Sequence, residues 1–181
     1  LFFRDNTRVN CKRFTVSRTR LFGCHKLLLG TYVPTHNTRV KLLRDAWTLA
    51  IETLSWIELQ RLGERLALAK AAKQLKIKDS KVIGLAHKLV SETLRRKNLI
   101  DFLLNSTLAP RSLNEFRLGP RNFLRLYLYE TKMVNSDLEK AVSIARMGRS
   151  ILGWRELKEI EEMLGETLNI QLDSILKGVE D

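Results

Sequence analysis

Apolar residues recur at steps of three and four from Thr38 onward, which is the period of a helix with one buried face. Thr38 can cap the first such helix, and Gly63 breaks the pattern. The predicted inner face of this helix consists of Leu43, Ala46, Trp47, Ala50, Leu54 and Ile57.

Three more helical runs follow before residue 110. The second is expected to bury Leu66, Ala69, Ala72 and Leu75. The third, capped by Asp79 or Ser80, has as its inward residues Val82, Ala86, Leu89, Val90 and Thr93. The fourth ends at Pro110 and carries as apolar residues Leu99, Phe102, Leu103 and Leu108.

The helical period continues after Pro120, which suits the start of a helix because its missing N–H needs no partner there. The apolar residues that follow at the spacing of a buried helical face are Phe123, Leu124, Tyr127 and Leu128. A helix capped by Ser136 or Asp137 has as its predicted inner face Leu138, Ala141, Val142, Ala145 and Leu152. Two short segments follow: residues 154–164, and one capped by Thr167 with Leu168, Leu172, Ile175 and Leu176. Seven or eight helices without a strand pattern predict an all-α bundle.

Residues 1–38 have a different pattern. They are rich in Arg, Thr and Asn and keep no helical period for long. A mitochondrial-type transit peptide has a similar composition, but no clean amphipathic helix accompanies it here. We therefore expect a basic, disordered arm over residues 1–38 and one helical domain over residues 39–181.

The net charge and its distribution along the chain indicate which kind of partner the protein binds. The chain of 181 residues has a net charge of +12, and no apolar run approaches the ~20 residues that span a bilayer. Residues 1–40 hold eight Lys or Arg against one acid, residues 41–120 hold fifteen against eight, and residues 121–181 hold nine against eleven. This excess predicts a polyanionic partner, most commonly nucleic acid, bound by a surface that precedes residue 121.

Chemistry-bearing motifs are scarce. The two cysteines, Cys11 and Cys24, fit a reducing cytoplasm rather than a stapled secreted domain. No glycine-rich nucleotide-binding motif occurs, and Cys11, Cys24, His25 and His36 match no zinc module. We therefore expect no metal, no cofactor and no enzymatic activity in this chain.

A band of nine cations lies between residues 70 and 97, interrupted only by Asp79 and Glu92. Three of them, Lys81, Lys88 and Arg95, recur every seven residues and so project from one helical face. Such a band suits the phosphates of a nucleic acid, although cations are also common on solvated helix faces. Because the band contains no stacking aromatics, recognition of backbone or shape is favoured over reading of splayed bases. The band consists of Lys70, Lys73, Lys76, Lys78, Lys81, Lys88, Arg95, Arg96 and Lys97.

Other residues admit a structural interpretation. Trp47 lies on the apolar face of its helix and is expected in the core, whereas the positions of Trp56 and Trp154 stay open. Arg125 is flanked by apolar residues, so we expect it to bond carbonyls or Glu130 rather than a ligand.

Three motifs, in order and with suitable gaps, resemble the NusB-like helical domain: Asn98-Leu-Ile-Asp-Phe-Leu-Leu, Phe123-Leu-Arg-Leu-Tyr-Leu-Tyr-Glu130 and Lys140-Ala-Val-Ser-Ile-Ala-Arg146. More closely, the stretch from Leu54-Ser-Trp-Ile-Glu-Leu through Arg149-Ser-Ile-Leu-Gly-Trp154 is similar to the N-terminal domain of archaeal Sun-family ribosomal RNA cytosine-5 methyltransferases. The similarity covers roughly residues 46–178.

The resemblance implies an all-α fold of about seven helices that binds RNA or docks against RNA or a catalytic domain. In the methyltransferases, the next domain holds S-adenosylmethionine and two motif cysteines, and this sequence contains no such half. The missing initiator Met favours a fragment of a longer protein, with a free-standing domain as the alternative. In stand-alone NusB proteins an arginine-rich segment at the start of the first helix contributes to RNA binding, and the matching residues here are Arg39, Lys41 and Arg44.

The sequence therefore predicts a cytoplasmic, non-catalytic RNA-binding domain that guides ribosomal RNA to a methyltransferase. One rival is a transcription antitermination factor that acts with a ribosomal-protein-like partner on a leader RNA. The other is a docking domain without RNA affinity. In the leading interpretation, Glu156, Glu159, Glu161 and Glu162 face solvent or a basic neighbouring domain. The predicted RNA contacts are Arg39, Lys41, Arg44, Lys73, Lys76, Lys78, Lys81, Lys88, Arg95, Arg96 and Lys97.

Overall fold

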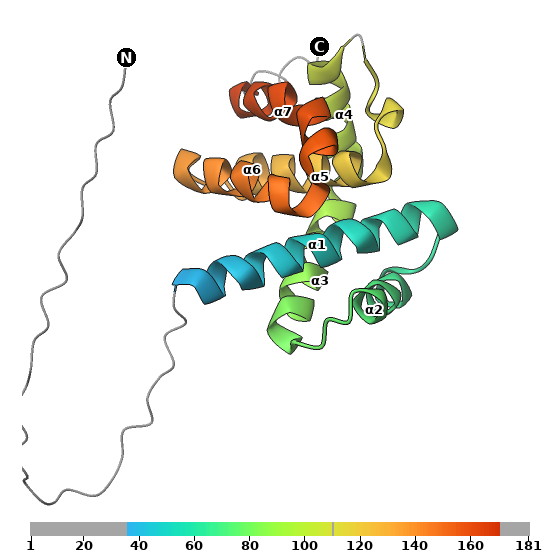
Figure 1. Cartoon of the computed structure of the whole chain (residues 1–181). Coiled ribbons are helices and arrows are strands. Elements are labelled where there is room, and N and C mark those ends of the chain that lie inside the picture. Colours follow the sequence, from blue (N-terminus) through green and yellow to red (C-terminus); the bar gives the residue numbers. More distant parts are fainter. Residues whose placement is uncertain (1–35, 110, 171–181) are drawn as a thin grey trace, which may run out of the picture. The chain divides into compact units, whose positions relative to one another are not determined.

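The computed structural model describes residues 36–109 and 111–170. These residues form seven α-helices and contain no β-strand, which confirms the predicted all-α class (Figure 1). Of the predicted arm, residues 1–35 lie outside the described part, and residues 36–38 already belong to the first helix. The helices are α1 (His36–Gln60), α2 (Glu64–Gln74), α3 (Ser80–Arg95), α4 (Lys97–Leu108), α5 (Leu118–Leu128), α6 (Leu138–Leu152) and α7 (Trp154–Asn169).

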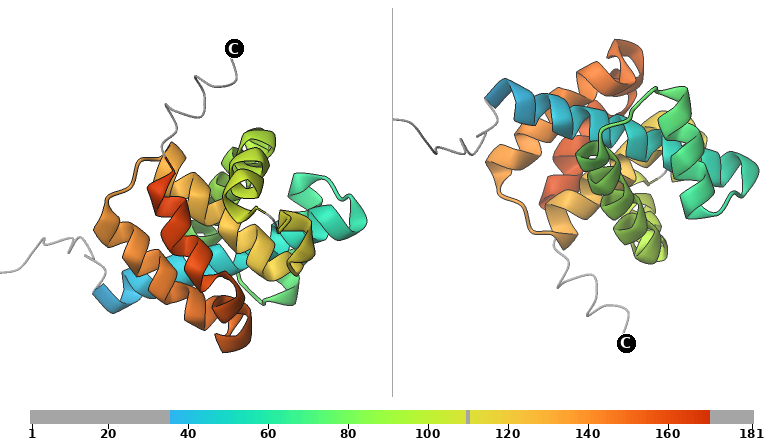
Figure 2. Two further views of the ribbon diagram at one scale, coloured as in Figure 1. Left: turned by 90° about the horizontal axis from the view of Figure 1, so that it is seen from above. Right: turned by 90° about the horizontal axis from the view of Figure 1, so that it is seen from below.

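Helix α1 lies across the middle of the bundle and contacts helices on both of its sides (Figure 1). Helices α2 and α3 pack against one side of α1, and α5 and α6 pack against the other. The N-terminal half of α1 runs beside α6 and its C-terminal half beside α2 (Figure 2). Helix α5 also contacts α4 and α7, so it is the centre of the second group.

All seven helices contribute buried residues to the core, and its aromatic centre lies where α1 meets α5. Trp47 of α1 is fully buried, as predicted, and its ring centroid lies 5.5 Å from that of Phe123 on α5. A Cβ atom on Gly148 would lie 2.9 Å from Cζ of Phe123 and 3.1 Å from Cδ1 of Leu157. The glycine therefore lets α6 approach α5 and α7 more closely than a residue with a side chain would.

A buried arginine ties α5 to α1 and α4. Arg125 is 3% exposed, and its Nε and Nη2 donate to the two carboxylate oxygens of Asp101 on α4 at 2.6 and 3.0 Å. Its Nη1 donates to Asn122 Oδ1 at 2.8 Å and also pairs with Glu58 of α1. Arg121 donates to the second oxygen of Glu58 at 3.1 Å. The predicted structural role of Arg125 is confirmed.

The prediction that Glu130 is a partner of Arg125 is wrong. The chain after α5 winds into a single π-helical turn, η2 (Tyr129–Met133), which carries the Glu130 side chain toward α6. There Glu130 accepts a hydrogen bond from Lys140 Nζ at 2.7 Å. Arg125, more than one turn earlier, faces α1 and α4 instead.

The predicted inner faces of α2 and α6 need correction. Leu66 and Leu138 are 67% and 66% exposed, and Val142 is also exposed. Apolar residues surround most of α2, so periodicity alone does not select the face that α1 and α3 cover. On α6 the small residues face inward because the neighbouring helices approach closely there. The buried residues are Ala67, Leu68 and Ala71 on α2, and Ala141, Ile144 and Gly148 on α6.

Helix boundaries differ from expectation near the C-terminus. The segment expected at residues 154–164 continues as α7 to Asn169, so Thr167 lies inside a helix and does not cap one. Its hydroxyl donates to the Leu164 carbonyl oxygen at 2.9 Å. The expected apolar residues Leu172, Ile175 and Leu176 lie outside the described residues. In the described ranges, no helix combines the length and apolar character needed to cross a bilayer.

Candidate nucleic-acid interface

The structure divides the eleven predicted RNA-contacting residues into three groups. Arg39, Lys41 and Arg44 lie in the first turns of α1. We call the five lysines from the last turn of α2 to the middle of α3 the corner lysines, and the three cations at the boundary between α3 and α4 the junction cations. The corner lysines are Lys73, Lys76, Lys78, Lys81 and Lys88, and the junction cations are Arg95, Arg96 and Lys97.

The turn that places the corner lysines is built from local hydrogen bonds. After α2, the Ile77 N–H bonds the Ala72 carbonyl at 3.0 Å and the Lys76 N–H bonds the Lys73 carbonyl at 3.2 Å. This is the Schellman pattern, and Lys76 takes the left-handed conformation, with a φ of 56°, that the motif requires. Asp79 then caps α3 by accepting from the Lys81 N–H at 2.9 Å, as predicted.

All five corner lysines are exposed, and none forms an ion pair with another described residue. Lys70, predicted in the same band, differs because its ammonium donates to Gln60 Oε1 at 2.7 Å and lies 3.7 Å from the Trp56 ring centroid. Five unpaired ammonium groups near one turn are therefore available to an external anion.

The junction cations are held by carboxylates. Arg95 donates to Glu92 at 2.8 Å, Arg96 pairs with the other oxygen of Glu92, and Lys97 donates to Asp101 at 2.6 Å. The hydrogen bond from Arg96, together with the neighbouring positive charges, holds the pKa of Glu92 below its ordinary value. An anion at this junction would have to compete with these pairs.

The three cations at the start of α1 differ in whether they pair with a carboxylate. Arg39 and Lys41 are exposed and have no ion pair with a described residue, whereas Arg44 Nη2 lies 3.0 Å from Asp45 Oδ1. Arg44 also lines a groove of about 800 Å³ between α1 and α6. Arg146 lines the same groove, is exposed and is free of ion pairs among the described residues. Sequence reasoning missed Arg146 because it is an isolated cation on α6, outside any charged run.

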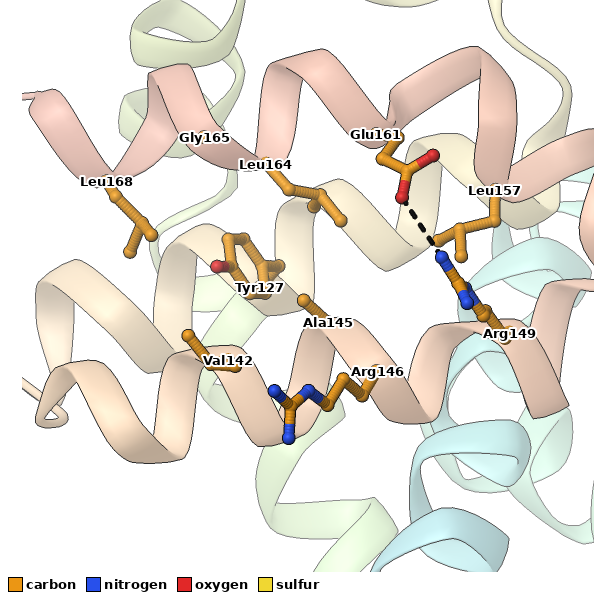
Figure 3. Close-up of a pocket in the computed structure, with 10 residues that line it drawn as sticks. All are labelled: Tyr127, Val142, Ala145, Arg146, Arg149, Leu157, Glu161, Leu164, Gly165 and Leu168. Carbon is orange, nitrogen blue, oxygen red and sulfur yellow. Dashed lines mark hydrogen bonds and ion pairs between the residues drawn. The ribbon is translucent and has the colours of Figure 1, made fainter. Parts of the chain in front are cut away.

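A smaller hollow of about 340 Å³ lies between α5, α6 and α7 (Figure 3). Its walls are mostly apolar, and the ion pair between Arg149 and Glu161, at 3.3 Å, crosses one side. Tyr127 of α5 lines the hollow beside Leu168 and Ala145, away from this ion pair, and burial raises the pKa of its phenol. In residues 36–109 and 111–170, no cluster of three His, Cys, Asp or Glu side chains could hold a metal ion.

The three tryptophans occupy different environments. Trp47 is in the core, and Trp56 is half-buried with its indole N–H donating to Gln74 Oε1 at 3.2 Å. Trp154, at the start of α7, is 64% exposed. No Phe, Tyr or Trp occurs from Glu64 to Lys97, so the segment that carries the corner lysines supplies no aromatic ring of its own for a base to stack on.

Comparisons with known proteins give one matching family model and two solved structures with a similar fold. The model of the NusB family matches residues 44–147. A chain in the crystal structure of a plectonemic RNA supercoil superimposes with a TM-score of 0.62 at 19% identity, covering 71% of this chain and 95% of that chain. A chain in the crystal structure of the antitermination factors NusB and NusE in complex with dsRNA gives 0.61 at 19% identity, with 71% and 97% covered. Comparison with curated protein sequences gives no match.

Proposed function

The chain belongs to the NusB family, and we propose that it is a non-catalytic RNA-binding domain that works in the cytoplasm without a cofactor. The observation that carries the proposal is the set of exposed corner lysines without a carboxylate partner among the described residues. Each ammonium that neutralises a phosphate releases a condensed counterion, which favours binding. The lack of Phe, Tyr and Trp between Glu64 and Lys97 favours contact with the RNA backbone over contact with bases.

The other predicted cations have secondary roles in this proposal. Arg39 and Lys41 extend the binding surface at the start of α1, where the family resemblance expects an arginine-rich contact. Arg44 and the junction cations contact RNA only if a phosphate replaces the carboxylate with which each of them pairs in the free chain. The eleven residues are therefore unequal, and the corner lysines contribute most.

We further propose that the RNA is structured ribosomal RNA and that the domain guides it to a cytosine-5 methyltransferase of the Sun type. The similarity of residues 46–178 to the archaeal N-terminal domains supports this role. Helix α7 supports it as well, because Glu159 and Glu162 are exposed on it without an ion pair among the described residues and suit a basic neighbouring domain. S-adenosylmethionine and the catalytic cysteines would belong to that other domain.

A second candidate function is transcription antitermination. It is favoured by the fold shared with the chain found beside NusE and dsRNA. In that case a ribosomal-protein-like partner would strengthen binding to one short single-stranded element. The methyltransferase role requires instead a preference for structured ribosomal RNA without such a partner.

Binding across a salt series tests the proposal. Labelled fragments of structured ribosomal RNA, a short single-stranded leader RNA and duplex DNA are titrated with the chain between low and physiological salt. We expect a steep log–log dependence with preference for structured RNA. Negligible affinity for every RNA at physiological salt would contradict an RNA-binding function and would favour a docking domain.

A further inference from the structure

A groove of about 580 Å³ runs between α2 and α3. It is lined mostly by small or apolar side chains, together with the cations Arg65 and Lys78. No residue of the described part of the chain fills it. The residues of this groove that matter for its chemistry are Arg65, Ala69, Ala72, Lys78, Gly84 and His87.

The charge around the groove is almost entirely positive. Arg65 and Lys78 line it, and both are exposed without an ion pair among the described residues. The neighbouring carboxylate of Glu64 is already engaged by His87 Nε2 at 3.2 Å and by the Ser91 hydroxyl. The other nearby acid, Asp79, caps α3. An anionic ligand in the groove therefore meets two cations without an ion pair in the described part of the chain, and Asp79, which caps α3, is the carboxylate beside Lys78.

Gly84 leaves the α3 side of this groove without a side chain at its position. It is exposed in the middle of a 16-residue helix, and a Cβ atom there would meet nothing within 4 Å. Glycine at such a position weakens a helix relative to alanine, so the fold gains nothing from it. Lys81 and Lys88 lie three residues before and four residues after Gly84, on the same face of α3. A ligand can thus approach the helix backbone between two ammonium groups.

We infer that this groove seats one sugar–phosphate strand of a structured RNA, with Gly84 as the point of closest approach. The inference rests on the proposed function and adds a defined site to it. Lys81 and Lys88 are seven residues apart, about 10 Å along the helix axis, so both ammonium groups can contact phosphates of the same strand. An acidic protein helix would bring apolar side chains to the same groove, and its binding is a distinct outcome of the test below.

The test is a steric block that leaves every charge in place. Gly84→Gln adds a side chain over the groove, and Gly165→Gln is the matched control because Gly165 is also an exposed helical glycine with open space around it. Ala69→Gln blocks the facing wall from α2, where Ala69 is exposed, and serves as a second variant. Binding of a labelled ribosomal RNA hairpin is measured at one salt concentration, and circular dichroism with a thermal melt checks the fold.

We expect Gly84→Gln and Ala69→Gln each to weaken binding about tenfold, the size of losing one or two phosphate contacts, and Gly165→Gln to leave it unchanged. Unchanged affinity in both groove variants, with the wild type binding RNA, would overturn the groove while leaving the RNA-binding function intact. Equal weakening by Gly165→Gln would also overturn it. If the wild-type chain binds an acidic peptide but no RNA, both the groove and the proposed function fail.

Discussion

The two ends of α3 carry cations of the same sign in opposite electrostatic situations. At the N-terminal end, Lys78 and Lys81 are exposed and lack a carboxylate partner among the described residues. At the C-terminal end, Arg95 and Arg96 share Glu92, and Lys97 at the start of α4 is held by Asp101. A band that is continuous in sequence therefore divides into a part available to an external anion and a part neutralised from within.

The difference shows that the availability of a cation to an external anion depends on whether a carboxylate lies close to it in space. The number of cations that follow one another in the sequence matters less. Asp101 is the clearest case. It accepts from Lys97 on its own helix and from the buried Arg125 of α5, so one carboxylate neutralises a surface cation and a core cation together. Substitutions that change these pairs should change the contrast between the two ends of α3.

The largest effect is expected at the buried end of this ionic network. Arg125→Met removes the buried cation that Asp101 and Glu58 share and leaves them only Lys97 and Arg121 as partners, so we expect a loss of about 3 kcal/mol in the free energy of unfolding. Urea denaturation measures it. The control Arg146→Met removes an exposed arginine without an ion pair among the described residues and should change stability by no more than about 0.5 kcal/mol. Equal effects of the two substitutions would contradict the structural role of Arg125.

A medium effect is expected from releasing the junction cations. Glu92→Gln removes the carboxylate that holds Arg95 and Arg96, so the two guanidinium groups become available to RNA. We expect tighter RNA binding and a log–log salt slope that is steeper by about one to two. The control Glu159→Gln removes an exposed acid of α7 that has no ion pair with a described residue. An identical gain from both variants would mean that only net charge matters.

The smallest effect is expected in the response to acid. Because the pKa of Glu92 is lowered in the folded chain, its contribution to stability is present above the ordinary pKa of a free glutamate. The contribution is lost as the pH falls through the lowered folded value. Thermal melts from neutral to acidic pH should therefore show a slightly shallower decline for Glu92→Gln than for the wild type, since exposed pairs contribute little. A steeper decline in the variant would contradict the assigned sign.

The sequence predicted the helices well where one face is clearly apolar. All five residues expected inward on α3 are buried, as are Phe123, Leu124, Tyr127 and Leu128 of α5. It failed on α2, where apolar residues surround the helix, and on α6, where Gly148 lies at the closest contact between helices. In both cases the face is chosen by neighbouring helices, which periodicity does not contain.

The candidate site was predictable in composition but not in pairing. Heptad spacing placed Lys81, Lys88 and Arg95 on one face of a helix, but only the structure shows that Arg95 is bound to Glu92. The groove escaped sequence reasoning because Arg65 and Gly84 are isolated residues on separate helices. Spacing along the chain cannot report a surface that arises only when two helices pack side by side.

The most direct test of the central claim compares two double variants of equal charge. RNA binding is measured across a salt series for the wild type, for Lys81→Gln with Lys88→Gln, and for Arg95→Gln with Arg96→Gln. We predict that the lysine variant loses about two from the salt slope, while the arginine variant, whose cations are already paired, loses less than one. Equal losses in both variants, or a larger loss in the arginine variant, would contradict the claim that unpaired corner lysines are the principal RNA contacts.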